Sequence, residues 1–169
     1  MAEENINSRY PWIRLAIALL LATIGGVGMW SVVVALPSVQ AEFGVARGAA
    51  SFPYTMTMIC FGIASIFMGR LADRIGIFVP LVIGAVLLCI GYISASHAAT
   101  IGQFTLLQGL LIGVGSSVTF APLLSDTSLW FTKNRGLAVG IIASGNYVAG
   151  TFWPPVLTHF IQTSGWRDT

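Results

Sequence analysis

The chain has 169 residues, of which 56% are hydrophobic and only 8% are charged, and its formal net charge at pH 7 is +2. Soluble domains carry about 25% charged residues, so the composition excludes an ordinary soluble domain and indicates an integral membrane protein. No basic patch exceeds two residues, and nothing in the charge pattern suggests nucleic-acid binding.

Long uncharged intervals predict the membrane-spanning helices. About 20 apolar residues cross a bilayer as a helix, and the intervals between charged residues contain 27, 22, 51 and 31 residues. The longest interval has a polar break at 94–100, which predicts two helices joined by a short turn. The sequence therefore predicts an all-α polytopic membrane protein with five transmembrane helices, at 12–36, 49–68, 78–93, 101–124 and 136–160.

The prolines agree with these boundaries. Pro37 follows the first span, and Pro80 lies in the first turn of the third, where its missing N–H is not needed. Pro154 and Pro155 are expected to interrupt the fifth helix near its far end. Membrane β-strands are not expected, because the apolar runs lack the alternation that a barrel strand needs.

The basic residues predict the orientation. With the amino terminus in the cytoplasm, six of the eight basic side chains lie on the cytoplasmic side, as the positive-inside rule requires. These six are Arg9, Arg14, Arg70, Arg74, Lys133 and Arg135, whereas Arg47 and Arg167 lie outside. The tail 1–11 and the connections 69–76 and 125–135 are then cytoplasmic, and the end 161–169 is external.

A cleaved signal peptide is the alternative interpretation of the first span, because Arg9 and Arg14 precede an apolar run and 39–41 is a tolerable cleavage pattern. The uncharged stretch is longer than a usual signal core, which favours a membrane helix. Cys60 and Cys89 fall in separate spans without a disulfide pattern, and we expect them to be packing residues.

Spaced small residues predict close helix contacts. Glycines and alanines four residues apart let two membrane helices approach each other. Such pairs are Gly109 and Gly113, Gly136 and Gly140, and Gly145 with Ala149, and the first helix adds Gly25, Gly26 and Gly28.

The segment 69–76 is a short charged hairpin between the second and third helices. Arg70 lies at the carboxyl end of the second helix, where the helix dipole favours a cation, and a glycine at each end permits a sharp turn. Asp73 has no such local partner. The residues of interest are Gly69, Arg70, Asp73, Arg74 and Gly76. The alternative is that these charges only solvate a loop and orient the protein.

Asp126 falls at the cytoplasmic end of the fourth helix, level with this hairpin. A carboxylate near a helix carboxyl terminus is unfavourable unless a cation is close. The sequence therefore predicts that Asp126 pairs with Arg70 or Arg74. The alternative is an interfacial carboxylate capped by water or by Lys133.

Polar and aromatic side chains near the middle of the spans are candidates for lining a central cavity. An unsatisfied amide in hydrocarbon costs several kcal/mol, so Asn146 should face protein, water or a solute. The candidates are Trp30, Tyr54, Ser117, Asn146 and Tyr147, with Ser116, Thr119 and Ser144 as further polar groups. The alternative for each is packing or hydrogen bonding between helices.

The membrane interior is otherwise without ionisable groups, apart from Asp126 at an edge and His97 and His159 near the outer interface. No proton relay is expected in this chain. No nucleophile and base, and no metal-ligand spacing, stand together. We therefore expect no enzyme, no catalytic residue, no metal site and no cofactor.

Three segments resemble one transporter family. The pattern G-x-L-A-D-R-x-G at 69–76 resembles the signature loop of the major facilitator superfamily. The stretch 40–47, Gln-Ala-Glu-Phe-Gly-Val-Ala-Arg, and the W-F-x-x-x-R-G-x-A-x-G pattern at 130–140 are similar to the monocarboxylate-porter and oxalate/formate-antiporter branch. The resemblance implies secondary transport of a small organic anion. It also implies that Asp73 approaches a helix amino terminus in the second half of such a transporter.

The chain departs from the family pattern in two places. Thr105 stands where the fourth-helix R-x-x-Q-G pattern has arginine, and the fifth helix lacks a G-P-x-x-G-G run, so coupling and direction stay open.

Porters of this family are built from two six-helix halves. The resemblance therefore implies that this chain is an amino-terminal fragment that lacks a sixth helix and is inactive alone. Its expected partners are the lipid bilayer, a small organic anion and the missing carboxyl-terminal half. The alternative is a small five-span membrane scaffold or assembly subunit without transport activity.

Overall fold

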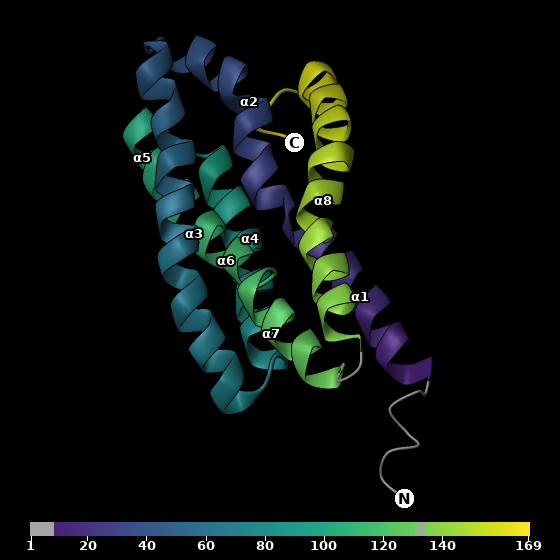
Figure 1. The fold of residues 1–169 in the computed structure, drawn as a ribbon. Helices are drawn as coiled ribbons and strands as arrows, with labels where there is room; N and C mark the ends of the chain where they lie inside the picture. The colour runs from purple at the N-terminus through teal and green to yellow at the C-terminus, as the bar shows by residue number, and fades with distance from the viewer. Residues whose placement is uncertain (1–8, 132–133) are drawn as a thin grey trace, which may run out of the picture.

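The computed structural model describes residues 9–131 and 134–169 (Figure 1). Within these ranges the secondary structure is entirely helical, and the predicted all-α fold is confirmed. The helices are α1 (Arg9–Gly25), α2 (Val27–Phe43), α3 (Arg47–Ile75), α4 (Phe78–Ser96), α5 (Ile101–Leu107), the π-helix η2 (Gln108–Gly113), α6 (Val114–Ser117), α7 (Ala121–Trp130) and α8 (Arg135–Ser164). They form one bundle of roughly parallel rods. Of the expected tail 1–11, residues 1–8 lie outside the described residues.

Four helical stretches of the described chain are long and apolar enough to cross a membrane. They are Tyr10–Phe43, Arg47–Ile75, Phe78–Ser96 and Ile101–Trp130. The fifth expected span lies in α8, which has 30 residues but carries polar groups such as Ser144, Asn146 and His159 along its length. The structure is that of a multi-pass membrane protein, and α8 is not among these four stretches.

Pro37 does not end the first span as expected, because it lies inside α2, which continues to Phe43. Pro154 and Pro155, which were expected to interrupt and kink the fifth helix, lie inside α8, which continues to Ser164. A proline removes one N–H donor from a helix. In hydrocarbon, however, the remaining backbone groups cannot bind water. They keep hydrogen-bond partners only if the helix continues.

The charged segment 69–76 is also not the hairpin that was predicted. Arg70, Asp73 and Arg74 lie in the last turns of α3, and the chain reverses only at Gly76 and Ile77. Gly76 has φ of 84°, a conformation that glycine adopts without steric cost. The first charged residue after an apolar run marks the edge of the hydrocarbon layer. The helix itself continues beyond it into the polar headgroup layer. For the same reason α7 runs through Asp126 to Trp130, where a connection at 125–135 was expected.

The predicted single helix at 101–124 is broken into pieces. It changes from α to π geometry at Gln108, and a turn at 118–120 separates α6 from α7. Phe120 has φ of −115° and ψ of −84°, outside the helical region, and Pro122 lies in the first turn of α7. The first span is broken as well, because Gly26 stands between α1 and α2.

Two hydrophobic clusters form the core, one toward each end of the bundle. The cluster at the end where α1 begins, called here the N-terminal end, contains Leu15, Ala18, Ala22, Leu123, Phe131, Ala138 and Ile142. The cluster toward the opposite end contains Val32, Ala35, Val39, Ala95, Ala98, Phe104 and Ile112. The breaks in the first and fourth spans lie between these clusters in sequence and in space (Figure 1).

Glycines bring α6 and η2 close to their neighbours. A Cβ added at Gly115 would lie 2.9 Å from the carbonyl oxygen of Gly84 on α4, and one added at Gly113 would lie 2.8 Å from the carbonyl oxygen of Thr57 on α3. The predicted small-residue contacts are therefore present here. Gly136 and Gly140 differ, because no atom of the described chain lies within 4 Å of a Cβ built there.

Replacing Gly115 by Ala should destabilise the protein, because the new methyl group meets backbone that cannot move aside without separating α4 from α6. Overpacking of this kind costs about 1–3 kcal/mol. The measurement is thermal unfolding in detergent followed by tryptophan fluorescence. Gly62→Ala on α3 is the matched control, since a Cβ at Gly62 meets nothing within 4 Å. Equal melting temperatures for the two variants would contradict this packing.

Candidate functional site

The breaks in the first and fourth spans touch each other in the middle of the bundle. A Cβ added at Gly25 would lie 2.1 Å from Cγ2 of Thr119, and one added at Gly28 would lie 1.9 Å from Oγ of Ser116. Only glycine leaves room for this approach. Discontinuous helices that meet inside a membrane protein mark a common type of transport site.

Two tryptophans on facing helices satisfy backbone carbonyls around the break. Nε1 of Trp153 on α8 donates to the carbonyl oxygen of Thr23 on α1, at 2.8 Å. In the opposite direction, Nε1 of Trp30 on α2 donates to the carbonyl oxygen of Asn146 on α8, at 3.3 Å. Each indole thus supplies a donor to the helix that faces it, which attaches α8 to both sides of Gly26.

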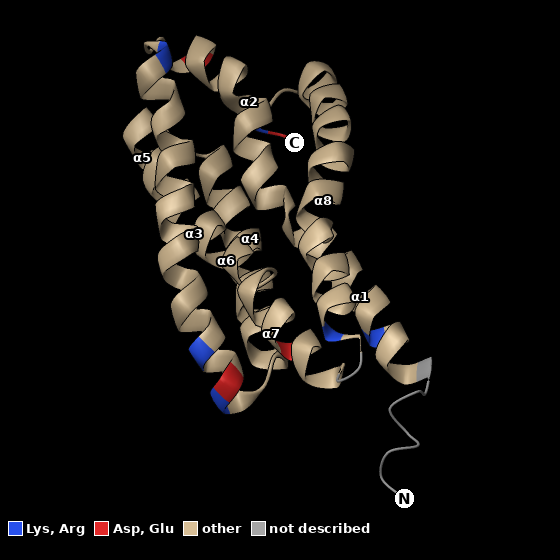
Figure 2. Ribbon diagram, in the orientation of Figure 1, with Lys and Arg blue, Asp and Glu red and all other residues tan. Residues whose placement is uncertain are grey.

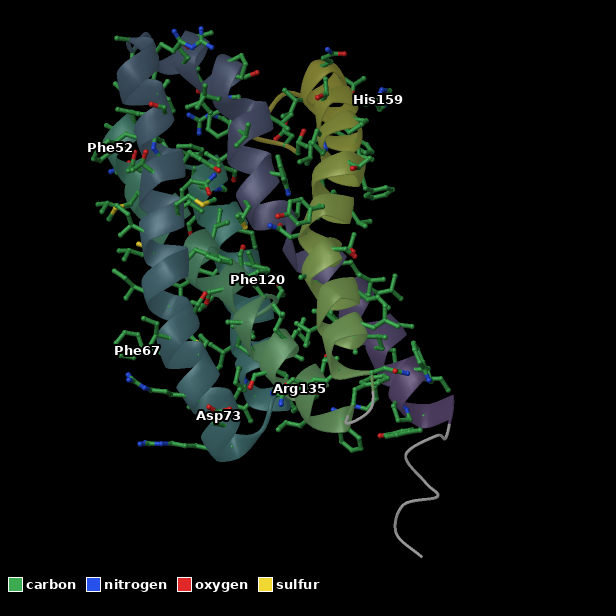
Figure 3. The ribbon with its side chains drawn as sticks, in the orientation of Figure 1. Phe52, Phe67, Asp73, Phe120, Arg135 and His159 are labelled. Atoms are coloured by element: carbon green, nitrogen blue, oxygen red, sulfur yellow. The ribbon has the colours of Figure 1, made fainter. Side chains whose placement is uncertain are left out.

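A small pocket of about 10 Å³ lies where the two breaks meet. It is lined by Ala22, Gly25, Gly26, Met29, Phe61, Ser116, Thr119, Phe120 and Asn146. The Ser116 side chain is only 1% exposed, and its Oγ has no hydrogen-bond partner among the described residues. Phe120, labelled in Figure 3, stands near mid-height of the bundle. The pocket therefore combines aromatic walls with neutral hydrogen-bonding groups.

The five cavity candidates from the sequence fall into different places. Asn146 lines the small pocket, and its carbonyl binds the indole of Trp30, so the structure brings these two together. Ser117 is fully buried and donates to the carbonyl oxygen of Val114 at 2.6 Å, which is a packing arrangement. Tyr147 is 76% exposed and Tyr54 is 38% exposed, and neither lines the small pocket.

The charges at the end of α3 are exposed. Among the described residues, Arg70, Asp73 and Arg74 have no ion-pair partner. Figure 2 shows them at the N-terminal end of the bundle, and Figure 3 labels Asp73 there. Their proposed gating role stays a prediction, since it involves a partner beyond this chain.

The predicted partner of Asp126 was wrong, because the carboxylate pairs with Arg14 on α1. Nη2 of Arg14 lies 3.0 Å from Oδ2 of Asp126, and its guanidinium carbon lies 4.1 Å from the ring centroid of Trp130. The sequence indicates at which level of the bundle Asp126 lies, and several cations lie at the same level. It does not indicate which helix packs beside α7. The alternative partner, Lys133, lies outside the described residues.

An ion pair at the opposite end was missed by sequence reasoning. Arg167 lies 2.7 Å from Oε1 of Glu42, and its other nitrogens donate to the carbonyl oxygens of Ser96 and Ala98 at the end of α4. The indole of Trp166 also donates to Glu42. One signal was available: Glu42 and Arg167 lie on the same predicted side of the membrane, where few other charges are found.

A larger cavity of about 360 Å³ lies beside this ion pair. Its lining includes Ser31 and Tyr92, whose hydroxyl oxygens are 2.9 Å apart, and Gln108 from η2. Gln108 is 3% exposed, and its Oε1 has no hydrogen-bond partner among the described residues. Trp166, Arg167, Asp168 and Thr169 border this cavity, so the ion pair and the cavity form one region.

The arrangement separates charge from the middle of the bundle. Charged side chains gather at the two ends in Figure 2, whereas the contacts around the breaks are neutral. In residues 9–131 and 134–169, no group of three or more His, Cys, Asp or Glu side chains stands close enough to hold a metal ion. The middle of the bundle therefore combines aromatic rings with neutral hydrogen-bonding groups around a space of about 10 Å³.

Replacing Asp126 by Asn should lower the stability of the N-terminal end. Both partners are partly exposed, so the expected loss is about 0.5–1 kcal/mol. Thermal unfolding in detergent measures it, and the reversed pair Arg14→Asp with Asp126→Arg should recover part of the loss. The control is Asp73→Asn, whose carboxylate has no ion-pair partner in the described chain. Equal losses for both carboxylates would contradict the assignment.

Replacing Arg167 by Gln should release the segment after α8. The variant loses the Glu42 pair and two backbone contacts, and net hydrogen bonds contribute about 1 kcal/mol each. Amide hydrogen exchange at 165–169 should then accelerate roughly fivefold or more. Arg47→Gln is the control, because Arg47 is exposed without an ion-pair partner in the described chain. Unchanged exchange in the Arg167 variant would contradict this anchoring.

Comparison with known proteins identifies the family. The sequence matches the description "Major Facilitator Superfamily" over residues 18–167. It is similar to the fujikurins efflux protein of Gibberella fujikuroi, with 36% identity over 118 residues that cover 69% of this chain and 25% of that protein. It is similar to monocarboxylate transporter 11 of Homo sapiens, with 27% identity over 158 residues that cover 94% of this chain and 34% of that protein.

A third relative is the agnestins efflux protein AgnL12 of Paecilomyces divaricatus, with 31% identity over 114 residues that cover 66% of this chain and 26% of that protein. The chain thus spans about a quarter to a third of the length of these curated relatives. The resemblance seen at 69–76 is confirmed by a match that extends over nearly all of the described helices. The chain belongs to the major facilitator superfamily.

Proposed function

We propose that this chain is the amino-terminal portion of a secondary transporter that moves small organic anions of the mono- or dicarboxylate type by alternating access. The observation that carries the proposal is the segment 69–76, which places Asp73 exposed and without an ion-pair partner in the described chain at the end of α3. The similarity to monocarboxylate transporter 11 along 94% of the chain supports this cargo class.

The location and orientation belong to the same proposal. The protein would lie in the plasma membrane, or the inner membrane of a cell with two, with its amino terminus in the cytoplasm and residue 169 outside. The basic residues support this orientation, since Arg14, Arg70, Arg74 and Arg135 share the N-terminal end of the bundle. Lipid is then the partner of the exposed apolar faces of α3 and α4.

The mechanism follows from the neutral middle of the bundle. Asn146 and Ser116 would hydrogen-bond the polar end of a cargo, and the Phe120 ring would contact its apolar part. A cation that balances the cargo charge would come from the carboxyl-terminal half, because the described residues around the two breaks include no cation. Asp73 would bind a helix amino terminus of that half and favour one of the two access states.

A second candidate is export of an uncharged metabolite. Two of the relatives are named efflux proteins. The wall around the breaks carries Phe61, Phe120 and Met29 beside neutral polar groups, which suits an uncharged cargo better than an anion. The transport experiment below separates the two candidates.

Transport by the full-length gene product should be measured in vesicles with labelled lactate, oxalate and formate, beside the 169-residue chain alone. We expect uptake of at least one anion by the full-length protein and none by the chain alone. Asp73→Asn should slow uptake roughly tenfold, since charge and dipole contacts contribute up to about 2 kcal/mol. Arg47→Gln is the control. Uptake of none of the three anions would contradict the anion proposal and leave export of uncharged compounds.

A further inference from the structure

The small pocket at the two breaks is sized for a single small occupant. Its volume is about 10 Å³, close to the space that one water molecule needs. A carboxylate cargo is larger than this space and cannot enter it. The pocket lies near mid-height of the bundle, where Figure 3 labels Phe120, one of its lining residues. An occupant of this space is therefore a single water molecule or a single ion.

Three side chains bring oxygen atoms to this pocket. Oγ of Ser116 has no hydrogen-bond partner among the described residues, and Ser116 is only 1% exposed. The hydroxyl of Thr119 donates its proton to the carbonyl oxygen of Ser116 at 2.8 Å, so its lone pairs are what remains to bind an occupant. The side-chain amide of Asn146 adds a third oxygen. A hydroxyl buried without a partner costs free energy unless the occupant of the pocket binds it.

Backbone N–H groups of the lining residues are already used. At the first break, the N–H of Gly26 donates to the carbonyl oxygen of Ala22 at 3.0 Å, and the N–H of Met29 donates to that of Gly26 at 3.1 Å. At the second break, the N–H of Thr119 donates to the carbonyl oxygen of Ser116 at 3.2 Å. These N–H groups are thus not available to an anion, whereas the side-chain oxygens remain available to a cation.

The rest of the lining narrows the kind of cation. Phe61 and Phe120 both line the pocket, with ring centroids 6.2 Å apart, and aromatic faces attract cations. None of the lining residues is an Asp or a Glu. Calcium and magnesium ions bind mainly through carboxylates, so a monovalent ion suits this lining better. Among the common monovalent ions, sodium fits a space of this size better than the larger potassium.

We propose that this pocket is a sodium site, with Oγ of Ser116, Oγ1 of Thr119 and the amide oxygen of Asn146 as its side-chain ligands. Backbone carbonyls of broken helices commonly complete such sites. The ion adds positive charge to a neutral wall, beside any cation of the carboxyl-terminal half, and a cargo carboxylate contacts this wall through the ion. The role toward the cargo rests on the proposed function, whereas the sodium site itself does not.

Sequence patterns do not reveal a site of this kind. The expectation of no metal site rests on His, Cys and carboxylate ligands at short spacing. The ligands proposed here are neutral, and they come from the end of the fourth span and from the middle of α8.

The test measures thermal unfolding of the full-length protein in detergent, in sodium, potassium or choline chloride at equal ionic strength. An ion that binds only the folded state raises the melting temperature as its concentration exceeds its Kd. We expect a saturable rise with sodium and none with potassium or choline. Equal melting temperatures in the three salts overturn the sodium site and leave a water molecule as the occupant.

Ser116→Ala tests the ligand assignment, and Ser117→Ala is its matched control. Ser117 is buried beside it but donates to the carbonyl oxygen of Val114 and does not line the pocket. Ser116→Ala should weaken sodium binding roughly tenfold, as expected for the loss of one contact to a charged group. In choline chloride this variant should melt no lower than the parent, because it loses only an unpartnered hydroxyl. Ser117→Ala should keep the sodium dependence of the parent. Unchanged sodium dependence in Ser116→Ala overturns the assignment.

Uptake of labelled lactate by the full-length protein in vesicles separates this inference from the cargo proposal. Replacing external sodium by choline should slow uptake roughly fivefold or more, which is the usual size of coupling between two ligands. Sodium-dependent melting without uptake of lactate, oxalate or formate rejects the proposed cargo and leaves the sodium site standing. Equal uptake in both salts, together with equal melting temperatures, rejects the sodium site and leaves the cargo proposal standing.

Discussion

The absence of water from the hydrocarbon core is the constraint on which the rest of this structure depends. Each backbone N–H and C=O group in that region needs a partner inside the protein. A break in a helix removes such partners, so a break survives only where other groups replace them. Trp153 provides a donor for the carbonyl of Thr23 at the first break, and at the second the carbonyl of Ser116 accepts from both the amide and the hydroxyl of Thr119.

The same constraint favours close packing at the breaks. The replacement donor at the first break comes from a neighbouring helix, α8, and it reaches the backbone only where the helices are close. Glycines at 25, 26 and 28 provide that closeness toward Thr119, Ala149 and Ser116. Irregular backbone, close packing and the unpaired Oγ of Ser116 therefore lie together at the breaks, whereas the other unpaired buried side-chain atom of the described residues, Oε1 of Gln108, lines the larger cavity. Hydrogen-bonding groups of the interior are thus found at both places.

The sequence was sufficient to predict the helical class, the position of most spans and the family, because each rests on local patterns of apolar and charged residues. It placed the helix ends too early at Arg70 and Pro37, since apolarity reports the hydrocarbon boundary and not the end of the hydrogen-bonded helix. It also gave Asp126 the wrong partner, because lateral neighbours depend on packing between distant segments. At the candidate site, polarity and depth led to Asn146, which lines the small pocket, whereas Trp30, expected as an aromatic wall, instead bonds the Asn146 carbonyl. Their contact with a cargo stays a prediction, and the break at 118–120 has no simple signal in the sequence.

The confinement of charge to the two ends has an electrical consequence. Moving one elementary charge across a membrane potential of 100 mV involves about 2.3 kcal/mol. No Asp, Glu, Lys or Arg lies between Arg14 and Glu42 or between Arg47 and Arg70, and both ion pairs are neutral as units. Rearrangement of the helices then carries almost no gating charge. Any voltage dependence of a transport cycle would arise from the cargo and its accompanying ions, and the membrane potential would leave these helices themselves unmoved.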